Sequence, residues 1–250
     1  MATKRAALEV LLRSKQLDVT LTTARPWMEP EDRLAPTGNA ELDQALGGGV
    51  RRGQLSEIVG ARSSGRTSLL CQLLAAATAR GEVVALVDTC DRFDPESAAA
   101  AGVDLERLLW VREHGDAARA LKAVNLVVQA GGFGVVAFDL ADVSSAAIRQ
   151  YPFTTWMRLS RVIEGSQTAM VLLGTDRIAR SAGGATIALE AAGRGARGRW
   201  AGATDRARHL TALDINPRVI TAHAPARGTS HVAPRTSHMA RRTSHVAHRT

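Results

Sequence analysis

The sequence contains few of the residues expected of a secreted or membrane protein. It has only two cysteines in 250 residues, Cys71 and Cys90, too few for a disulfide scaffold. No uninterrupted apolar run approaches the ~20 residues of a membrane span. Charges interrupt the apolar residues from Met1 to Arg13, so this segment does not resemble a signal peptide. We expect a cytoplasmic protein without a membrane segment, and association with the nucleoid stays open.

Lysine is also scarce, because 29 of the 32 basic residues are arginines. Residues 1–176 carry a net charge of −2, whereas residues 177–250 carry +10. A basic C-terminal third could attract DNA or RNA, although an arginine-rich composition can equally reflect genome base composition. The candidate contacts for non-specific DNA are Arg177, Arg180, Arg194, Arg197, Arg199, Arg206 and Arg208.

The C-terminal segment is repetitive and lacks large apolar residues. Related heptapeptides begin at Thr229, Thr236 and Thr243. Such a segment cannot bury enough apolar surface to offset the entropy of ordering its backbone. We therefore predict a disordered basic tail over residues 221–250, with a role that the sequence does not reveal.

Before this tail, short apolar strands alternate with helical segments, which predicts an α/β fold with a mostly parallel sheet flanked by helices. The expected strands are Gln54–Val59, Val83–Asp88, Leu108–Arg112, Val135–Asp139 and Met170–Gly174. The expected helices are Thr67–Ala79, Asp116–Gln129 and Thr155–Glu164. Two later strand candidates, Ile187–Ala191 and His209–Ile215, are expected to form an antiparallel extension.

The predicted organisation has three parts. Residues 1–35 hold an N-terminal helix (Met1–Leu17) and the start of a linker rich in Pro, Glu and Asp (Pro26–Pro36). Residues 36–220 form the core, and residues 221–250 form the tail.

The segment from Gly60 to Ser68 lies between a predicted strand and a predicted helix, where a phosphate-binding loop belongs. Glycines let backbone N–H groups surround phosphate oxygens, and the helix directs its positive end toward them. The candidate nucleotide-binding residues are Gly60, Ser63, Ser64, Gly65, Arg66, Thr67 and Ser68. Arg66 replaces the usual lysine with a larger, forked cation. The loop therefore either binds ATP or retains the shape of a binding loop without its ligand.

A second candidate is Asp139, which ends the apolar run Val135–Asp139. An acidic residue at the end of a buried strand can hold Mg²⁺ through water. Thr67 and Asp139 are the expected magnesium contacts if a nucleotide binds.

The segment Thr37–Gly60 resembles the entry to a RecA-type core, with its Thr-Gly, Leu-Asp and Gly-rich elements. The likeness continues through Ala85–Pro95, Ala101–Leu105 and Leu108–Trp110, and it covers about residues 35–220. The resemblance implies a RecA-like P-loop core. More narrowly, the chain resembles ImuA, a family of RecA-like accessory proteins of bacterial DNA-damage-induced mutagenesis.

The resemblance also implies departures from RecA recombinases. The glutamate that orients the attacking water is replaced by Cys90, and Asp91 is a poor substitute because neighbouring extended residues point in opposite directions. The adenine-stacking aromatic is replaced near Ser97, and the polar sensor aligns near Gly174–Thr175. The two DNA-binding loops fall within Asp142–Pro152 and Ala179–Gly184 and are shorter. Hydrolysis is expected to be slow or absent, so no catalytic residue is predicted.

These features favour an adaptor of SOS mutagenesis and translesion synthesis that binds RecA or a polymerase-like ImuB partner, with an error-prone polymerase as a further partner. The N-terminal helix would reach a neighbouring protein, or it would cover its own core. The alternative is a residual DNA-dependent ATPase or recombinase paralogue. Cys71, in an apolar helix, is expected to be a core residue.

Overall fold

The structure is a computed structural model that describes residues 33–179, 183–190, 197–201 and 209–221. The predicted N-terminal helix and the repeat tail lie outside these residues. No described helix combines the length and apolar character needed to cross a bilayer.

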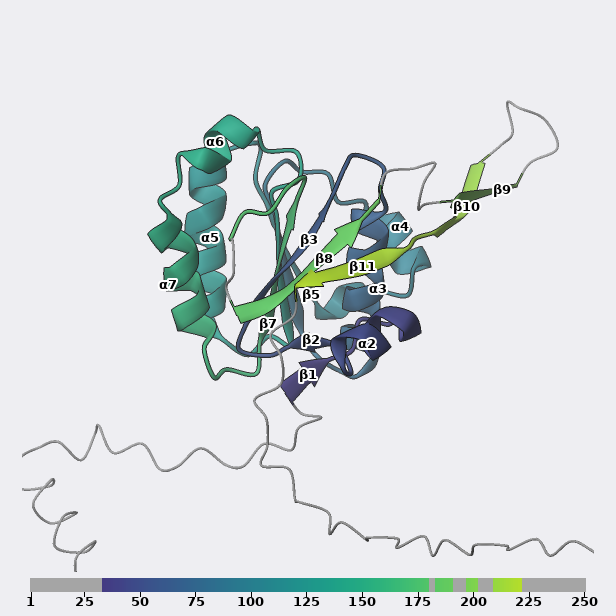
Figure 1. Cartoon of the computed structure of the whole chain (residues 1–250), viewed down its shortest axis with the longest axis horizontal. Coiled ribbons are helices and arrows are strands. Elements are labelled where there is room, and N and C mark those ends of the chain that lie inside the picture. The colour runs from purple at the N-terminus through teal and green to yellow at the C-terminus, as the bar shows by residue number, and fades with distance from the viewer. Residues whose placement is uncertain (1–32, 180–182, 191–196, 202–208, 222–250) are drawn as a thin grey trace, which may run out of the picture.

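A seven-stranded sheet, in the order β11-β8-β3-β7-β6-β4-β5, forms the centre of the molecule (Figure 1). Its strands are β3 (Leu55–Gly60), β4 (Val84–Asp88), β5 (Leu108–Arg112), β6 (Val135–Asp139), β7 (Ala169–Gly174), β8 (Gly183–Leu189) and β11 (Pro217–Thr221). All pairs are parallel except β11 with β8. The predicted α/β fold with a mostly parallel sheet is therefore confirmed.

Helices cover both faces of this sheet (Figure 1). The described helices are α2 (Ala40–Leu46), α3 (Arg66–Ala79), α4 (Pro95–Ala100), α5 (Ala117–Ala130), α6 (Ser145–Arg149) and α7 (Phe153–Ile163), with a 3₁₀ turn η3 at Leu105–Arg107. Alternate strand residues form two cores: one packs against α3 and includes Leu86, and the other packs against α5 and α7 and includes Phe138. Cys71 is buried in the first core, as predicted.

The α3 helix is buried on most sides, since eight of its fourteen residues are buried. The α5 helix presents only one apolar side to the sheet, and the Asp116 carboxylate caps its first turn by accepting hydrogen bonds from Ala118 and Arg119. The layer containing α3 therefore occupies the interior, while α5 and α7 keep one side toward solvent.

The C-terminal strands differ from the prediction of an antiparallel extension. The first of them, β8, pairs parallel to β3, and the antiparallel edge is β11, which the sequence pattern did not predict. The other predicted strand, β10 (His209–Asp214), pairs with β9 (Arg197–Ala201) outside the main sheet. Apolar patterning predicts a strand but does not identify its partner, which explains the difference.

The end of the predicted linker is also ordered. Leu34–Ala35 form β1, which pairs antiparallel with β2 (Val50–Arg51), and Ala35 is fully buried. The core therefore includes residues that the predicted boundary at 35/36 assigned to the linker. A two-residue strand is too short to leave a periodic signal in the sequence.

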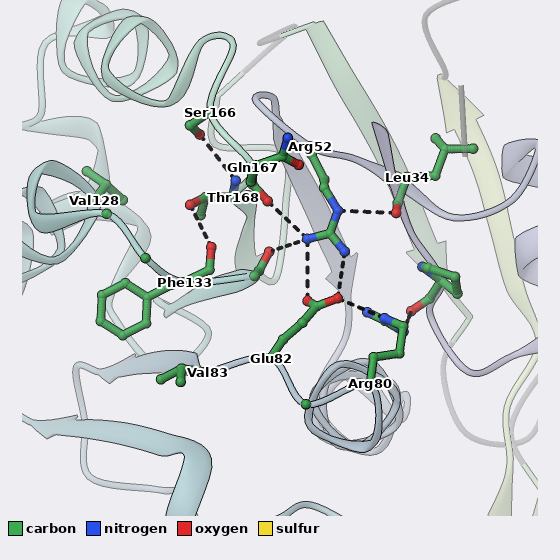
Figure 2. Close-up of a pocket in the computed structure, with 15 residues that line it drawn as sticks. Leu34, Arg52, Arg80, Glu82, Val83, Val128, Phe133, Ser166, Gln167 and Thr168 are labelled. Atoms are coloured by element: carbon green, nitrogen blue, oxygen red, sulfur yellow. Dashed lines mark hydrogen bonds and ion pairs between the residues drawn. The ribbon is translucent and has the colours of Figure 1, made fainter. Parts of the chain in front are cut away.

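Arg52 joins β1 to the segments that precede β4, β6 and β7 (Figure 2). Its guanidinium donates to the carbonyl oxygens of Leu34 (3.3 Å), Gly134 (3.2 Å) and Gln167 (3.0 Å), and to the Glu82 carboxylate (2.7 Å). Burial alone would raise the pKa of Glu82, but hydrogen bonds from Arg80 and Arg52 outweigh burial and hold that pKa below its usual value. Arg52 therefore connects the amino ends of the strands.

The same residues line an open cavity of about 1030 Å³ at this edge of the sheet (Figure 2). The charged residues in its lining are Arg52, Arg80 and Glu82, which pair with one another. Both arginines bind the single Glu82 carboxylate and also donate to the backbone carbonyl oxygens of Leu34, Gly134 and Pro36, so we interpret this cavity as a structural joint that holds separate segments together.

We predict that Arg52→Ala lowers the free energy of unfolding by about 2–3 kcal/mol, because it leaves several partly buried acceptors without a donor. Urea denaturation at pH 7 measures this difference. As the pH falls below 4.5 the difference should shrink, since Glu82 loses its charge on passing through its lowered pKa. Arg119→Ala, which removes an exposed arginine 3.5 Å from Glu113, should change stability by less than about 0.5 kcal/mol. If Arg52→Ala lowered the free energy of unfolding no more than Arg119→Ala does, Arg52 would not hold these segments together.

Candidate functional site

The predicted phosphate loop connects β3 to α3 at the carboxyl edge of the sheet. Gly65 adopts a φ of +95° and Ser63 a φ of +62°, so the backbone turns sharply before the helix begins. A Cβ atom at Gly60 would lie 2.5 Å from the Ser64 hydroxyl and 2.7 Å from the Leu189 carbonyl oxygen. The loop is therefore closely packed, and only glycine fits at its first position.

Arg66 lies inside this loop with only 8% of its surface exposed. Its Nη1 atom has no hydrogen-bond partner among the described residues, and neither has the buried hydroxyl of Ser64. An uncompensated buried cation costs several kcal/mol unless an anion pairs with it. These two groups therefore fit a phosphate, which would accept hydrogen bonds from both.

The N-terminus of α3 adds further donors. No side chain caps this fourteen-residue helix, and Gly65 is its N-cap. Its first N–H groups and the positive end of its dipole favour an anion beside the loop. Thr67 is exposed and Ser68 is half-buried, so the Thr67 hydroxyl is accessible to a nucleotide-bound magnesium ion.

Asp139 ends β6 opposite Asp88, which ends β4. Burial raises the pKa of Asp139 to about 6; the hydrogen bond from Ala141 N–H and the charge of Arg66 oppose the increase, and the negative charge of Asp88 adds to it. Thus Asp139 interacts electrostatically with both Arg66 and Asp88. This arrangement suits a divalent cation held through water.

The sequence interpretation missed Asp88 and Thr89 as parts of this site. The Asp88 Oδ2 atom accepts a hydrogen bond from Phe93 N–H (2.8 Å), whereas Oδ1 is buried without a partner. The Thr89 hydroxyl is also buried and unpartnered. The available signal was the position of Asp88 at the end of an apolar strand, which is the same signal that identified Asp139.

Cys90 and Asp91 follow directly after this pair. Burial raises the pKa of Cys90, and the carboxylates of Asp142, Asp139 and Asp88 raise it further, so the thiol stays neutral. Asp91 is bound by Arg112, at 2.8 and 2.9 Å. Since Arg112 belongs to β5, on the side of β4 away from β6, the Asp91 carboxylate is held away from Asp139.

Asp142 lies between two exposed arginines at the rim of the site. Its carboxylate is 3.7 Å from Arg62 in the phosphate loop and 3.5 Å from Arg92 after β4. Through these weak ion pairs, Asp142 keeps the two guanidinium groups of Arg62 and Arg92 near the phosphate loop. Sequence reasoning did not connect these three residues, because they come from three separate loops.

A buried carboxylate binds the backbone of the loop that follows β7. Glu57 on β3 is 3% exposed, and its Oε1 atom accepts hydrogen bonds from Ile178 and Ala179 N–H, both at 2.7 Å. Arg177 is exposed two residues before the predicted second DNA loop, which begins at Ala179. Thr175, near the predicted sensor, is exposed and donates to Asp176 (3.3 Å).

The other predicted positions are distributed as follows. The first predicted DNA loop contains α6 and is therefore partly helical. Ser97 is exposed and hydrogen-bonds to Asp94 at the start of α4. The backbones of Arg197 and Arg199 lie in β9, and the remaining candidate arginines fall outside the described residues: Arg180, Arg194, Arg206 and Arg208.

The sheet order, the helices on both faces and the phosphate loop define a RecA-like core. Residues 28–150 match the family model of the RecA N-terminal domain. The solved structure of the RadB recombinase superposes with a TM-score of 0.52 at 19% identity, covering 66% of this chain and 87% of that chain. This likeness supports the fold.

Part of the chain is also similar in sequence to curated RecA proteins. Protein RecA of Methylococcus capsulatus is 42% identical over 107 residues, which cover 42% of this chain and 30% of that protein. Protein RecA of Mycobacterium ulcerans is 39% identical over 107 residues, which cover 42% of this chain and 31% of that protein. The chain thus matches about a third of the length of these relatives.

We predict that Asp139→Asn stabilises the ligand-free protein by about 1–3 kcal/mol at pH 7, because it removes a charge that burial disfavours. A carboxyl whose pKa is raised on folding binds its proton more tightly in the folded state. The stability of the wild type relative to the variant should therefore fall as the pH rises from 3.8 to about 6. Urea titrations of both proteins across this range measure the difference. A difference independent of pH would contradict the raised pKa.

Proposed function

We propose that this chain is a DNA-repair accessory protein that binds MgATP, hydrolyses it slowly, and acts by contacting other proteins. The observation that carries this proposal is the combination of an unpaired buried Arg66 in the loop with a neutral Cys90 at the position of the catalytic glutamate. The first feature favours an anionic ligand, and the second removes the group that would activate water.

The residues that would hold the nucleotide are the loop glycines, Ser64, Arg66 and Thr67. Asp139 and Asp88 would hold the magnesium ion through water. MgATP, when bound, supplies a transferable γ-phosphoryl group. The protein's own contribution is to hold the phosphates, neutralise their charge with Arg66 and keep the Cys90 thiol uncharged.

The specific role that we propose is that of an adaptor in SOS mutagenesis and translesion synthesis. The proposed partners are RecA, an ImuB-type polymerase homologue and, through it, an error-prone polymerase. Support comes from the ImuA-like sequence features and the RecA-like core. The proposed place of action is the cytoplasm, at the nucleoid.

A residual recombinase or DNA-dependent ATPase is the second candidate function. The neighbouring pair of Asp88 and Asp139 supports it as well, because the magnesium ion that this pair would hold serves both binding and hydrolysis of ATP. The two candidates differ in turnover.

We expect isothermal titration with a non-hydrolysable ATP analogue and Mg²⁺ to detect binding to the purified chain. Arg66→Ala and Thr67→Ala should each weaken binding about tenfold or more, since each removes a contact to charged oxygens or to the metal. The matched controls, Arg119→Ala and Thr154→Ala on exposed helix surfaces, should leave it unchanged. An absence of binding heat would overturn the nucleotide part of the proposal.

ATP hydrolysis in the presence of single-stranded DNA should be slow, and Cys90→Glu should increase it. A water-positioning group contributes ~10²–10⁴-fold to such reactions. Phosphate release from both proteins, with Asp139→Asn as the inactive reference, measures the effect. Rapid hydrolysis by the wild type would favour the recombinase alternative.

We further propose non-specific DNA contact through the exposed Arg177 and the basic C-terminal third. Binding of this kind weakens steeply with salt. Arg177→Glu should lower affinity for single-stranded DNA and reduce the salt slope by about 1, as expected when one phosphate contact is lost. Fluorescence anisotropy across a salt series is the measurement, and an affinity independent of salt would contradict the contact.

A further inference from the structure

The helices α5 and α7 lie side by side on one face of the sheet (Figure 1). Both connect parallel strands and run back across the same face, so their axes point the same way. Their inner sides are buried, as shown by Val124 on α5 and Trp156 on α7. Their outer sides form a surface that the described part of the chain leaves uncovered.

A groove of about 220 Å³ runs between the two helices. Leu121 and Leu159 supply its apolar lining, and Lys122 and Arg158 extend from its two sides. An apolar floor with positively charged edges can hold an apolar side chain while the charges meet acidic groups beside it.

The two helices carry basic residues and no acidic ones. The basic residues are Arg119, Lys122, Arg158 and Arg161. Arg119 pairs with Glu113, whereas the other three form no ion pair within the described residues. The acidic residues that adjoin the helices are Asp116, whose carboxylate caps the start of α5, and Glu164, which follows α7. The groove therefore presents an uncompensated positive surface.

Exposed aliphatic side chains repeat along the same surface. Leu126 is 66% exposed and lies four residues after Lys122; Val162 is 39% exposed and lies four residues after Arg158. A spacing of four residues places each pair on one side of its helix. Met157 is exposed on α7 as well. Each helix therefore presents a cation followed, one turn later, by an aliphatic group.

We infer that this α5/α7 groove is a docking site for an acidic amphipathic helix of a partner protein. Leucine-like residues of the partner would fill the groove and cover Leu126 and Val162, and its carboxylates would meet Lys122 and Arg158. Nucleic acid fits this surface less well, because phosphates gain nothing from the aliphatic groups. The groove is formed by helices on the face opposite α3, so docking does not require an occupied phosphate loop.

The test uses the purified full chain and a fluorescein-labelled peptide of about 15 residues, long enough for roughly four helical turns. The peptide carries leucines at the spacing i, i+3, i+4, i+7, which places them on one side of a helix, and glutamates at the other positions. Fluorescence anisotropy should detect binding. Lys122→Glu with Arg158→Glu, and separately Leu126→Ser with Val162→Ser, should each weaken it about tenfold or more, as expected of central interface residues.

Matched controls lie elsewhere on the surface. Arg33→Glu, beside β1, and Ile220→Ser, on the far edge strand β11, should leave peptide affinity within about twofold, as for residues outside an interface. Peptides with the glutamates replaced by lysines, or the leucines by serines, should not bind. Thermal unfolding checks that each variant remains folded. We expect the double variants to fold, because Lys122, Leu126, Arg158 and Val162 are all exposed.

Failure of the acidic peptide to bind would overturn the docking site. So would peptide affinity that is unchanged in both double variants. Binding of single-stranded DNA that is lost in Lys122→Glu/Arg158→Glu, while Leu126→Ser/Val162→Ser has no effect on either probe, would identify a nucleic-acid surface instead. The same protein preparations are also titrated with the ATP analogue. Because the groove and the phosphate loop are separate, a loss of peptide binding with unchanged binding of the analogue concerns the docking site alone.

Discussion

The guanidinium of Arg52 determines how the amino ends of the central strands are held together. Its hydrogen bonds reach Leu34, Glu82, Gly134 and Gln167, which belong to four separate segments. Only a planar group with five donors can meet so many acceptors from one position. Because these amino ends are fixed in register, the carboxyl ends of β3, β4 and β6 align as well. The pairing of β4 with β6 places Asp88 opposite Asp139, and the phosphate loop follows β3 at the same edge of the sheet.

The two edges of the sheet therefore serve opposite purposes. At the amino edge, the charges that line the cavity are paired. At the carboxyl edge, Arg66, Ser64, Asp88 and Thr89 each have a buried polar atom without a partner. Such atoms lower the stability of the folded state, and an anionic ligand with a cation would satisfy them. The neutral Cys90 and the displaced Asp91 suit retention of a nucleotide rather than rapid turnover. The α5/α7 groove that we propose for docking lies on the opposite face of the sheet from α3, so it is separate from the phosphate loop.

The sequence predicted much of the fold because the sheet is buried on both faces. Runs such as Val84–Val87 and Val135–Phe138 are apolar throughout, and that pattern identifies parallel strands covered by helices. The loop from Gly60 to Ser68 was recognisable for a similar reason, since glycine, serine and threonine at fixed spacing reflect local backbone geometry. The pairing of β8 was predicted wrongly, because an apolar strand pattern carries no information about its neighbour. Asp88 ends its strand just as Asp139 does, but its place beside Asp139 depends on the pairing of β4 with β6, which the sequence does not show.

The sequence by itself determined where the five central parallel strands and the helices α3, α5 and α7 lie, which residues form the phosphate loop, and that Cys90 follows shortly after β4. These properties depend on local backbone preferences and on the periodicity of apolar residues. Only the tertiary structure decided that Arg66 is buried without a partner, that Asp91 is held by Arg112, and that Lys122 and Arg158 flank one groove. Each of these depends on contacts between segments far apart in the chain, and the free energy of such contacts is set by burial and by charge in three dimensions.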